Sequence, residues 1–302
     1  MDKVLFYSLE SAVCIAMFTL FYILVMRKET FFSLNRFYLL FAMLFAMVIP
    51  VLNITYGTQA VDSAERGSFI STTLSSIETI KQGVVQLDPV VVTAAKSSWN
   101  LSLGQILVGS YLIGLVLFLS IFGLRFFNLF RVIKDSEKNY DGKYWYLKIQ
   151  DRSHQVYSFF NFIFIGKEKL KEQEYEPVLE HEKIHANLYH SVDLLFVEIL
   201  IILQWFNPFI YLLRKMVVEN HEFQADSSVV RSSGNRESYL RLILNHVINS
   251  QYFRMTSGFS HSLSKKRLKM LTRMKSSHHI LKIKVLAVLP IAVLMFLFFA
   301  CS

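Results

Sequence analysis

The sequence predicts a mainly α-helical integral membrane protein in which a small α+β unit is inserted between the third and fourth membrane spans. Two observations predict this fold class. Of the 302 residues, 53% are hydrophobic and 15% are aromatic, a composition too apolar for an ordinary soluble enzyme. Four apolar runs approach the ~20 residues that a helix needs to cross a bilayer, and the long region between the last two runs is more polar.

The four apolar runs divide the chain. They are Val4–Met26, Phe37–Leu52, Leu103–Phe126 and Ile283–Ala300. We interpret the first as a retained span, because it carries Glu10 and no small-x-small cleavage site precedes the basic residues after it. The predicted organisation is two transmembrane helices in 1–52, an extracytoplasmic loop at 53–102, a third helix at 103–126, an inserted domain at 127–282 and a fourth helix at 283–302.

Basic residues close to the spans predict the orientation, because Lys and Arg resist translocation. Arg27, Lys28 and Arg36 are expected to fill the short connection between the first two spans, which places that connection in the cytoplasm. Further basic clusters flank the inserted domain at 125–134 and 265–284. We therefore expect the domain 127–282 to be cytoplasmic. The same flanks explain the formal net charge of +9, so we expect no direct contact with nucleic acid.

The central region predicts a β-hairpin followed by a helix. Tyr144–Gln150 and Gln155–Ile165 are rich in aromatic and β-branched residues and are separated by turn-forming residues. A helix is expected from about Glu174, with Pro177 in its first turn. This helix carries His181-Glu182-Lys183-Ile184-His185, which has the pattern H-E-x-x-H.

The pattern predicts a zinc site. Residues i and i+4 lie one turn apart on one helix face, so His181 and His185 can reach a single tetrahedral Zn²⁺. Glu182 can take a proton from a metal-bound water and pass it to a leaving amine. The chain has only two cysteines, Cys14 and Cys301, which excludes a cysteine zinc cluster. Any metal must therefore be held by His and carboxylate.

A third ligand is expected in a second helical stretch. Glu222 and His221 are both candidates there, and they point about 100° apart on a helix. Asp226 follows Glu222 by one turn and could fix the outer nitrogen of a ligand His. Near the motif, His190 and Asp193 could either polarise a substrate or form a polar cap at the membrane face.

The apolar run from Val192 to Leu213 is nearly long enough to be a further span. A single crossing would separate His185 from Glu222 and prevent a shared metal ion. Asn207 suits an N-cap and Pro208 a first helical residue. We therefore expect one helix to end near Phe206 and another to return from Pro208 through Glu222, as a hairpin packed on or dipped into the membrane.

Several motifs together resemble the BlaR/MecR-type antirepressor metallopeptidases, which are membrane relatives of the gluzincins. They are Asn35-Arg36-Phe37-Tyr38-Leu39-Leu40, Ser158-Phe159-Phe160-Asn161, the H-E-x-x-H helix, Ser191-Val192-Asp193, Trp205-Phe206-Asn207-Pro208 and Glu222-Phe223-Gln224-Ala225-Asp226. The resemblance implies a zincin-like α+β domain. It also implies that His181, His185 and Glu222 bind Zn²⁺, that Glu182 is the base and that Asp226 supports the site.

The resemblance further implies a cytosolic protein substrate, either a transcriptional repressor or the protein itself, and a place in the bacterial inner membrane with the active site facing the cytoplasm. The best-known members carry an extracellular penicillin-binding sensor domain after the last span. This sequence ends at Cys301-Ser302, so we expect that domain to be lacking. We expect an edge near Phe159 to Ile165 to align the substrate by strand addition.

Two other functions share parts of this pattern. A housekeeping protease that clears misfolded membrane proteins would use the same chemistry on other substrates. A signalling scaffold could keep the metal for stability alone, although a structural site has no need of Glu182 and normally closes its fourth position. The sequence gives no indication of the oligomeric state.

Overall fold

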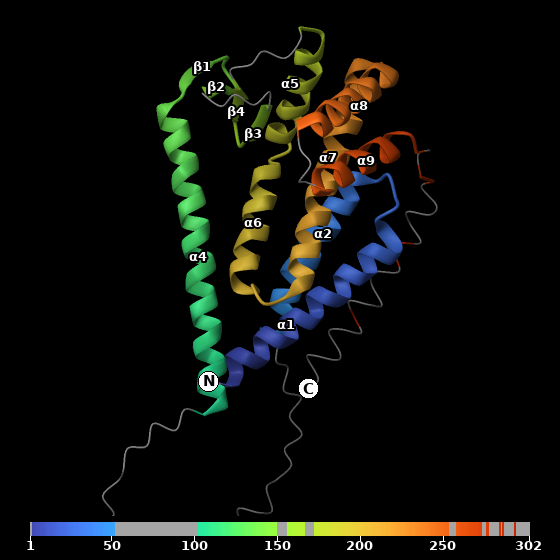
Figure 1. Ribbon diagram of the computed structural model, residues 1–302. Helices are drawn as coiled ribbons and strands as arrows, with labels where there is room; N and C mark the ends of the chain where they lie inside the picture. Colours follow the sequence, from blue (N-terminus) through green and yellow to red (C-terminus); the bar gives the residue numbers. More distant parts are fainter. Residues whose placement is uncertain are drawn as a thin grey trace, which may run out of the picture.

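Long helices make up most of the structure, and a small sheet lies at one end of them (Figure 1). The computed structural model describes residues 2–51, 102–149, 156–166, 172–253 and 258–273, and positions 276, 277, 284, 286 and 293. The elements before the sheet are α1 (Asp2–Phe21) with a π-helical end at Tyr22–Met26, α2 (Phe32–Val48) with a 3₁₀ turn at Ile49–Val51, and α4 (Leu103–Asp135). The strands are β1 (Glu137–Tyr140), β2 (Trp145–Ile149), β3 (Val156–Phe159) and β4 (Phe162–Gly166). The remaining helices are α5 (Glu172–Asn187), α6 (His190–Leu203), α7 (Pro208–Ser233), α8 (Arg236–Phe253) and α9 (Gly258–Leu271).

The described residues contain three helices that are long and apolar enough to span a membrane: Phe6–Met26, Phe32–Val51 and Leu103–Asp135. The pair α5 and α6 would add a fourth if it crossed as one broken span, and it bends by 60° at the break. The chain is thus a mainly helical membrane protein. The predicted loop 53–102 and the predicted fourth span 283–302 fall almost entirely outside the described residues.

The main core lies where α1, α2, α6 and α7 meet. Ile15 from α1, Met43 from α2, Val197 from α6 and Leu213 from α7 are all fully or almost fully buried there. Each of these helices buries one apolar stripe in this core, while exposed apolar residues cover the outer faces of α1 and α2. Such exposed apolar faces suit a hydrocarbon surrounding.

The start of the second span differs from the prediction. Helix α2 begins at Phe32, so Arg36 lies inside the helix and not in the connection before it. Its guanidinium donates two hydrogen bonds to the carboxylate of Asp193 on α6, at 2.6 and 3.0 Å. A buried partner makes the charge tolerable within an apolar helix. The apolar run alone therefore does not mark the first residue of the helix.

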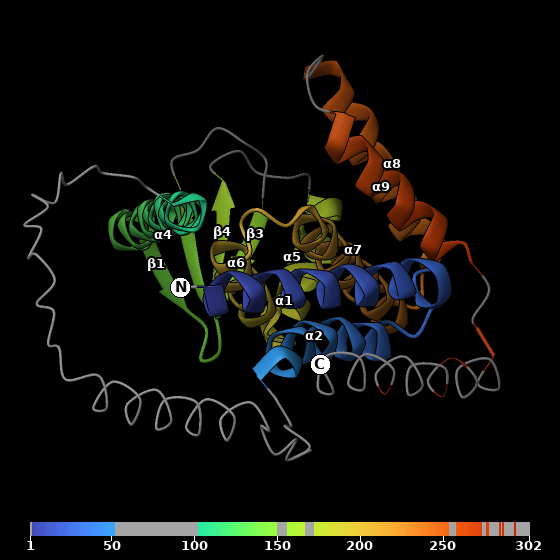
Figure 2. The ribbon, with the colours of Figure 1, turned by 90° about the horizontal axis from the view of Figure 1, so that it is seen from below.

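Helix α4 stands to one side of the bundle and contacts α6 (Figures 1 and 2). Its 33 residues run well beyond the predicted end at Phe126, up to the first strand. A close contact with the turn after α6 is at Gly114, where an added Cβ atom would lie 2.2 Å from the ring of Trp205. Around it, the Trp205 indole N–H donates to the carbonyl of Tyr111 at 3.3 Å and the ring stacks on Phe118.

We expect Gly114→Ala to weaken the contact between α4 and the turn that joins α6 to α7. The new methyl group overlaps the Trp205 ring, and overpacking of this kind typically costs about 1–3 kcal/mol. The measurement is thermal unfolding in detergent, with Gly109→Ala as the matched control because an added Cβ there meets nothing within 4 Å on the same helix. Equal melting temperatures for the two variants would contradict this contact.

The sheet has the order β1-β2-β4-β3, which corrects the predicted hairpin. The segment Gln155–Ile165 contains two strands, β3 and β4, which turn at Phe160 and pair antiparallel. Strand β2 pairs antiparallel with β1 and parallel with β4, so the two predicted strands do not form a hairpin with each other. Phe160 has a positive φ of 50°, unusual for a bulky residue, and Asn161 after it is a turn-forming residue whose single signal in an apolar run did not separate the two strands.

The helical hairpin between the H-E-x-x-H motif and Glu222 is present. Helix α6 ends at Leu203 and α7 starts at Pro208, where the side chain of Asn207 caps it by accepting from the Phe209 amide at 3.0 Å. The turn packs against α1, since the side-chain amide of Gln204 donates to the carbonyl of Ser8 at 3.2 Å. The hairpin brings α7 back against α5, so that residues of both helices can bind one metal ion.

Candidate metal centre

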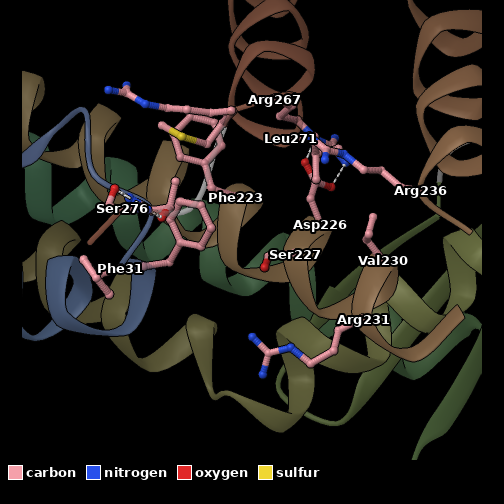
Figure 3. A pocket seen from close by; sticks show the side chains of 14 residues that line it. Phe31, Phe223, Asp226, Ser227, Val230, Arg231, Arg236, Arg267, Leu271 and Ser276 are labelled. Carbon is pink, nitrogen blue, oxygen red and sulfur yellow. Dashed lines mark hydrogen bonds and ion pairs between the residues drawn. The ribbon is translucent and has the colours of Figure 1, made fainter. Parts of the chain in front are cut away.

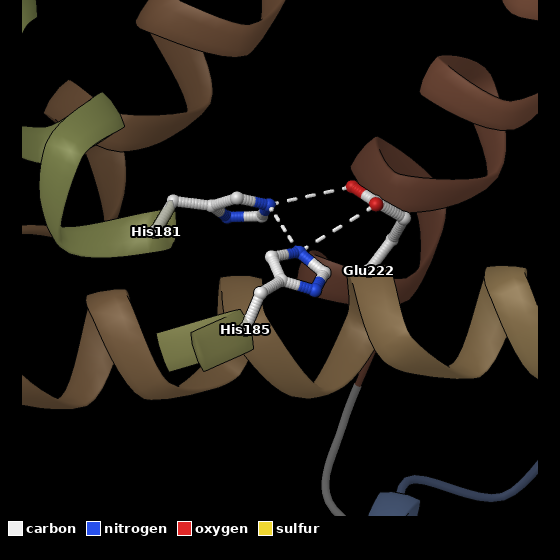
Figure 4. A group of neighbouring side chains, drawn as sticks. All are labelled: His181, His185 and Glu222. Carbon is white, nitrogen blue, oxygen red and sulfur yellow. Dashed lines mark hydrogen bonds and ion pairs between the residues drawn. The ribbon is translucent and has the colours of Figure 1, made fainter. Parts of the chain in front are cut away.

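Three side chains that the sequence singles out point at one another. His181 and His185 lie one turn apart on α5, and Glu222 faces them from α7 (Figure 4). The two imidazole Nε2 atoms are 3.0 Å apart. The Glu222 oxygens lie 3.4 Å from Nε2 of His181 and 3.6 Å from Nε2 of His185. His221, the alternative third ligand, instead bonds Asp193 through its Nε2 at 2.7 Å and lies apart from this group.

The spacing of these donors fits a tetrahedral zinc ion. With Zn–N and Zn–O distances of about 2.0–2.1 Å, two ligand atoms on a tetrahedron are separated by about 3.3–3.4 Å. The three observed separations of 3.0, 3.4 and 3.6 Å scatter around this value. Two imidazoles and one carboxylate are also the donor set of catalytic zinc sites that keep one position open.

The outer nitrogen of His181 is held by a second group of residues. Its Nδ1 lies 2.9 Å from the Tyr239 hydroxyl and 3.3 Å from the carboxylate of Asp226. The Tyr239 hydroxyl donates to the same Asp226 oxygen at 2.9 Å. Arg267 on α9 closes the group, with hydrogen bonds of 2.6 and 2.9 Å to Asp226 and an ion pair of 3.0 Å to Glu222. This arrangement directs Nε2 of His181 toward the other donors.

The charges around the donors favour a cation. Burial lowers the pKa of the His181 imidazole, but hydrogen bonds to Asp226 and Glu222 outweigh it and raise that pKa to about 9. Burial and the charge of His181 lower the pKa of His185 to about 3. Burial raises the pKa of Glu222, yet His181 and Arg267 hold it well below its usual range. His185 is thus neutral and Glu222 ionised, which are the forms that bind a metal, whereas a metal at Nε2 of His181 must displace a proton that this ring otherwise holds.

Glu182 lies beside the donors without being one of them. Its Oε2 accepts a hydrogen bond of 2.7 Å from the Ser158 hydroxyl on β3. Burial raises the pKa of this carboxyl above its ordinary value, although the charge of His181 opposes the shift. A raised pKa suits a group that takes and returns a proton near neutral pH. The hydrogen bond also joins α5, the metal helix, to the edge strand β3.

His190 and Asp193 lie behind His185 and not on an open face. Nδ1 of His190 is 2.8 Å from Nδ1 of His185, and its Nε2 is 3.3 Å from the side-chain oxygen of Gln224. Asp193 accepts from Arg36 and from His221. Both residues are almost fully buried, so they support the metal helix and do not contact a substrate.

A cavity of about 700 Å³ lies next to the centre, between α2, α7 and α9 (Figure 3). Asp226 and Arg267 line it together with three further arginines, Arg231, Arg236 and Arg273. None of the three donors lines this cavity. Asp226 and Arg267 therefore form the boundary between the cavity and the metal centre.

Sequence reasoning missed several residues that hold the centre in place. Ser158 belongs to a motif that carried the family resemblance, but no role followed from it. Tyr239 and Arg267 lie on helices that follow α7, and no local spacing links them to the H-E-x-x-H motif. Gln224 is part of the motif that contains Glu222, but the sequence assigned no role to its side-chain amide. Ser158 reaches Glu182 only through the packing of β3 on α5, and Tyr239 and Arg267 reach the site only through the packing of α8 and α9 on α7.

Comparisons with known proteins place the chain in a family. A search of curated proteins finds no match. A family model described as BlaR1 peptidase M56 matches residues 3–271, a stretch that includes the spans α1, α2 and α4, the sheet and the whole donor group. The chain therefore belongs to the BlaR1 peptidase M56 family.

Proposed function

We propose that the protein is a membrane-embedded zinc endopeptidase that cleaves a cytosolic protein, either a transcriptional repressor or itself, to relay a signal to transcription. The observation that carries the proposal is the convergence of His181, His185 and Glu222 with Glu182 beside them. Membership of a membrane peptidase family supports the reaction class. A zinc ion at these donors would polarise a scissile carbonyl and lower the pKa of a water molecule.

The residues of the chain then divide the work of peptide hydrolysis. Glu182 takes a proton from the attacking water and delivers it to the leaving amine. The hydrogen bond from Ser158 fixes the direction of this carboxylate. Asp226 and Tyr239 hold the His181 ring, so that its proton stays on the outer nitrogen.

Strand β3 is the part of the sheet best placed to align a substrate. It is one of the two edge strands in the order β1-β2-β4-β3, and it lies against the metal helix α5, whereas β4 lies inside the sheet and cannot take an added strand. The predicted edge near Phe159 to Ile165 is therefore wrong for Phe162–Ile165, which lie in the inner strand β4, and we place the edge at β3, Val156–Phe159. Because Ser158 on this strand contacts Glu182, a peptide added along β3 would run past the proposed base.

Contacts between the first connection and the metal helices support a signalling role. Arg27 forms an ion pair of 3.3 Å with Glu219 on α7, three residues before the ligand Glu222. Asn220 donates to the backbone carbonyl of Phe32 at the start of α2. A change in how the first two spans pack would thus act directly on the helix that carries a metal ligand.

Metal removal tests the reaction. We expect the purified protein in detergent to bind one zinc ion and to cleave unstructured protein substrates, to lose at least 100-fold in rate on chelation and to recover when zinc is restored. Metal analysis and a time course of fragments by mass spectrometry give the result. Full activity after complete removal of zinc would exclude the proposed reaction.

Thiol labelling tests the proposed orientation. In a background with Cys14 and Cys301 replaced by Ser, Leu103→Cys at the start of α4 and Arg241→Cys on α8 place single thiols at strongly exposed positions near opposite ends of the molecule (Figure 1). In spheroplasts, we expect an impermeant maleimide to label position 103 directly and position 241 only after the membrane is disrupted. The opposite pattern would place the metal centre outside the cytoplasm.

A further inference from the structure

We propose that His190 is a positioning residue for the metal ligand His185, and that it links this ligand to the beginning of α2. The inference rests on the proposed zinc function and extends it to the way the site is held and controlled. His190 is the first residue of α6, directly after the bend at Tyr189, and is 2% exposed. Its ring contacts Nδ1 of His185, the ring nitrogen that points away from His181 and Glu222.

The hydrogen-bond directions follow from metal binding. Nε2 of His185 faces His181 and Glu222, so a metal there takes its lone pair and leaves the ring proton on Nδ1. That Nδ1–H can donate only to an acceptor, and Nδ1 of His190 lies 2.8 Å away. His190 must then carry its own proton on Nε2, which donates to the Gln224 side-chain oxygen at 3.3 Å.

The same chain of donors ends on α2. The side-chain amide nitrogen of Gln224 donates to the Ser33 hydroxyl at 3.3 Å. Every step from His185 through His190 and Gln224 to Ser33 has a donor on one side and an acceptor on the other. Ser33 is the second residue of α2, one of the helices apolar enough to span the membrane.

A second connection reaches His190 from the same face of α2. Arg36 lies one turn after Ser33 and pairs with Asp193, whose Oδ2 also accepts from Nε2 of His221 at 2.7 Å. The ring of His221 stacks on that of His190, with centroids 3.9 Å apart and planes 6° apart. His190 is therefore fixed in its plane by hydrogen bonds and across its plane by stacking.

The consequence is that the orientation of His185 depends on where α2 lies. A ligand imidazole that loses its outer hydrogen bond is free to turn, and loss of such a partner typically costs about 10–100-fold in metal affinity. A shift of α2 relative to α7 would lengthen the bond between Ser33 and Gln224 first. Movement of α2 would thus change the affinity of the site for the metal without direct contact between this helix and the metal.

The test uses the intact purified protein and measures zinc affinity by competition with a chromophoric chelator, the absorption spectrum of the Co²⁺-substituted protein, and kcat and KM. We expect His190→Leu to weaken zinc binding by about 10–100-fold and to change the Co²⁺ spectrum. His190→Asn keeps an acceptor toward His185 and should remain within a few-fold of the unaltered protein. Unchanged affinity and spectrum in His190→Leu would overturn the positioning role.

The link to α2 is tested by Ser33→Ala, with Ser232→Ala as the control because that hydroxyl donates to the Val229 carbonyl of its own helix. We expect Ser33→Ala to weaken zinc binding by about two- to tenfold, and to add nothing further in the His190→Leu protein. Equal effects in both backgrounds, or none in either, would overturn the link. If His190→Leu does not fold, Ser33→Ala alone decides this point.

Failure of this inference can be told apart from failure of the proposed function. If the unaltered protein binds no zinc, the proposed function fails and the role of His190 fails with it. If the unaltered protein binds zinc and cleaves substrate while His190→Leu behaves identically, only the positioning role is overturned.

Discussion

Replacing Glu182 by Gln is expected to reduce peptide cleavage by about 10²–10⁴-fold while zinc stays bound. Glutamine has the same volume and can still accept the hydrogen bond from Ser158, so the metal helix keeps its packing. It cannot take a proton from water at neutral pH. Glu182 is not one of the three converging donors, so the metal content should not change.

The comparison requires initial rates and zinc content for the same preparations. Glu176→Gln is the matched control, because it makes the same change on an exposed part of the same helix. We expect this control to cleave at the rate of the unaltered protein. A Glu182→Gln protein that retains full zinc and more than a tenth of the rate would remove Glu182 from the chemistry.

Replacing Asp193 by Ala is expected to have the largest effect on stability. Asp193 is almost fully buried and receives hydrogen bonds from Arg36 and His221, so its loss leaves the guanidinium of Arg36, whose side chain is only 16% exposed, without its partner. Removal of one member of a buried ion pair typically costs about 3–5 kcal/mol. For a chain of this size, we expect a melting temperature lower by on the order of 10 °C.

Thermal unfolding in detergent checks this expectation against Glu237→Ala. Glu237 pairs with Arg241 on the surface of α8, where both side chains are more than three-quarters exposed, so its loss should not change the melting temperature measurably. Restoring neutrality with Arg36→Met in the Asp193→Ala protein should recover part of the lost stability, because the unpaired charge is removed as well. Equal melting temperatures for Asp193→Ala and the unaltered protein would show that the pair contributes nothing.

Local chemistry made the donors and the hairpin predictable from the sequence. The spacing of His181 and His185 is a property of one helix turn. Asn207 caps α7 and Pro208 has a fixed φ, so two adjacent residues predict the reversal between α6 and α7. The place of Glu222 followed from the family motif, and the structure brings it to the two imidazoles.

Non-local pairing explains what could not be predicted. The order of strands depends on a parallel contact between β2 and β4, whose register no single segment contains. The boundary of α2 was misplaced because Arg36 finds its partner on α6, far along the chain. Tyr239 and Arg267 likewise gain their roles only through the docking of α8 and α9. Arg36, Tyr239 and Arg267 each depend on a partner that is far away in the sequence.

The position of Arg267 on the last described helix has a consequence for biosynthesis. A ribosome makes the chain from its N-terminus, so the three donors and Asp226 leave the ribosome before the guanidinium that pairs with Glu222 and Asp226. During that interval the nascent site holds two carboxylates without their basic neighbour, and its attraction for a divalent cation is at its strongest. Under the proposed zinc function, this order of synthesis would let the metal bind first and α9 close the site afterwards.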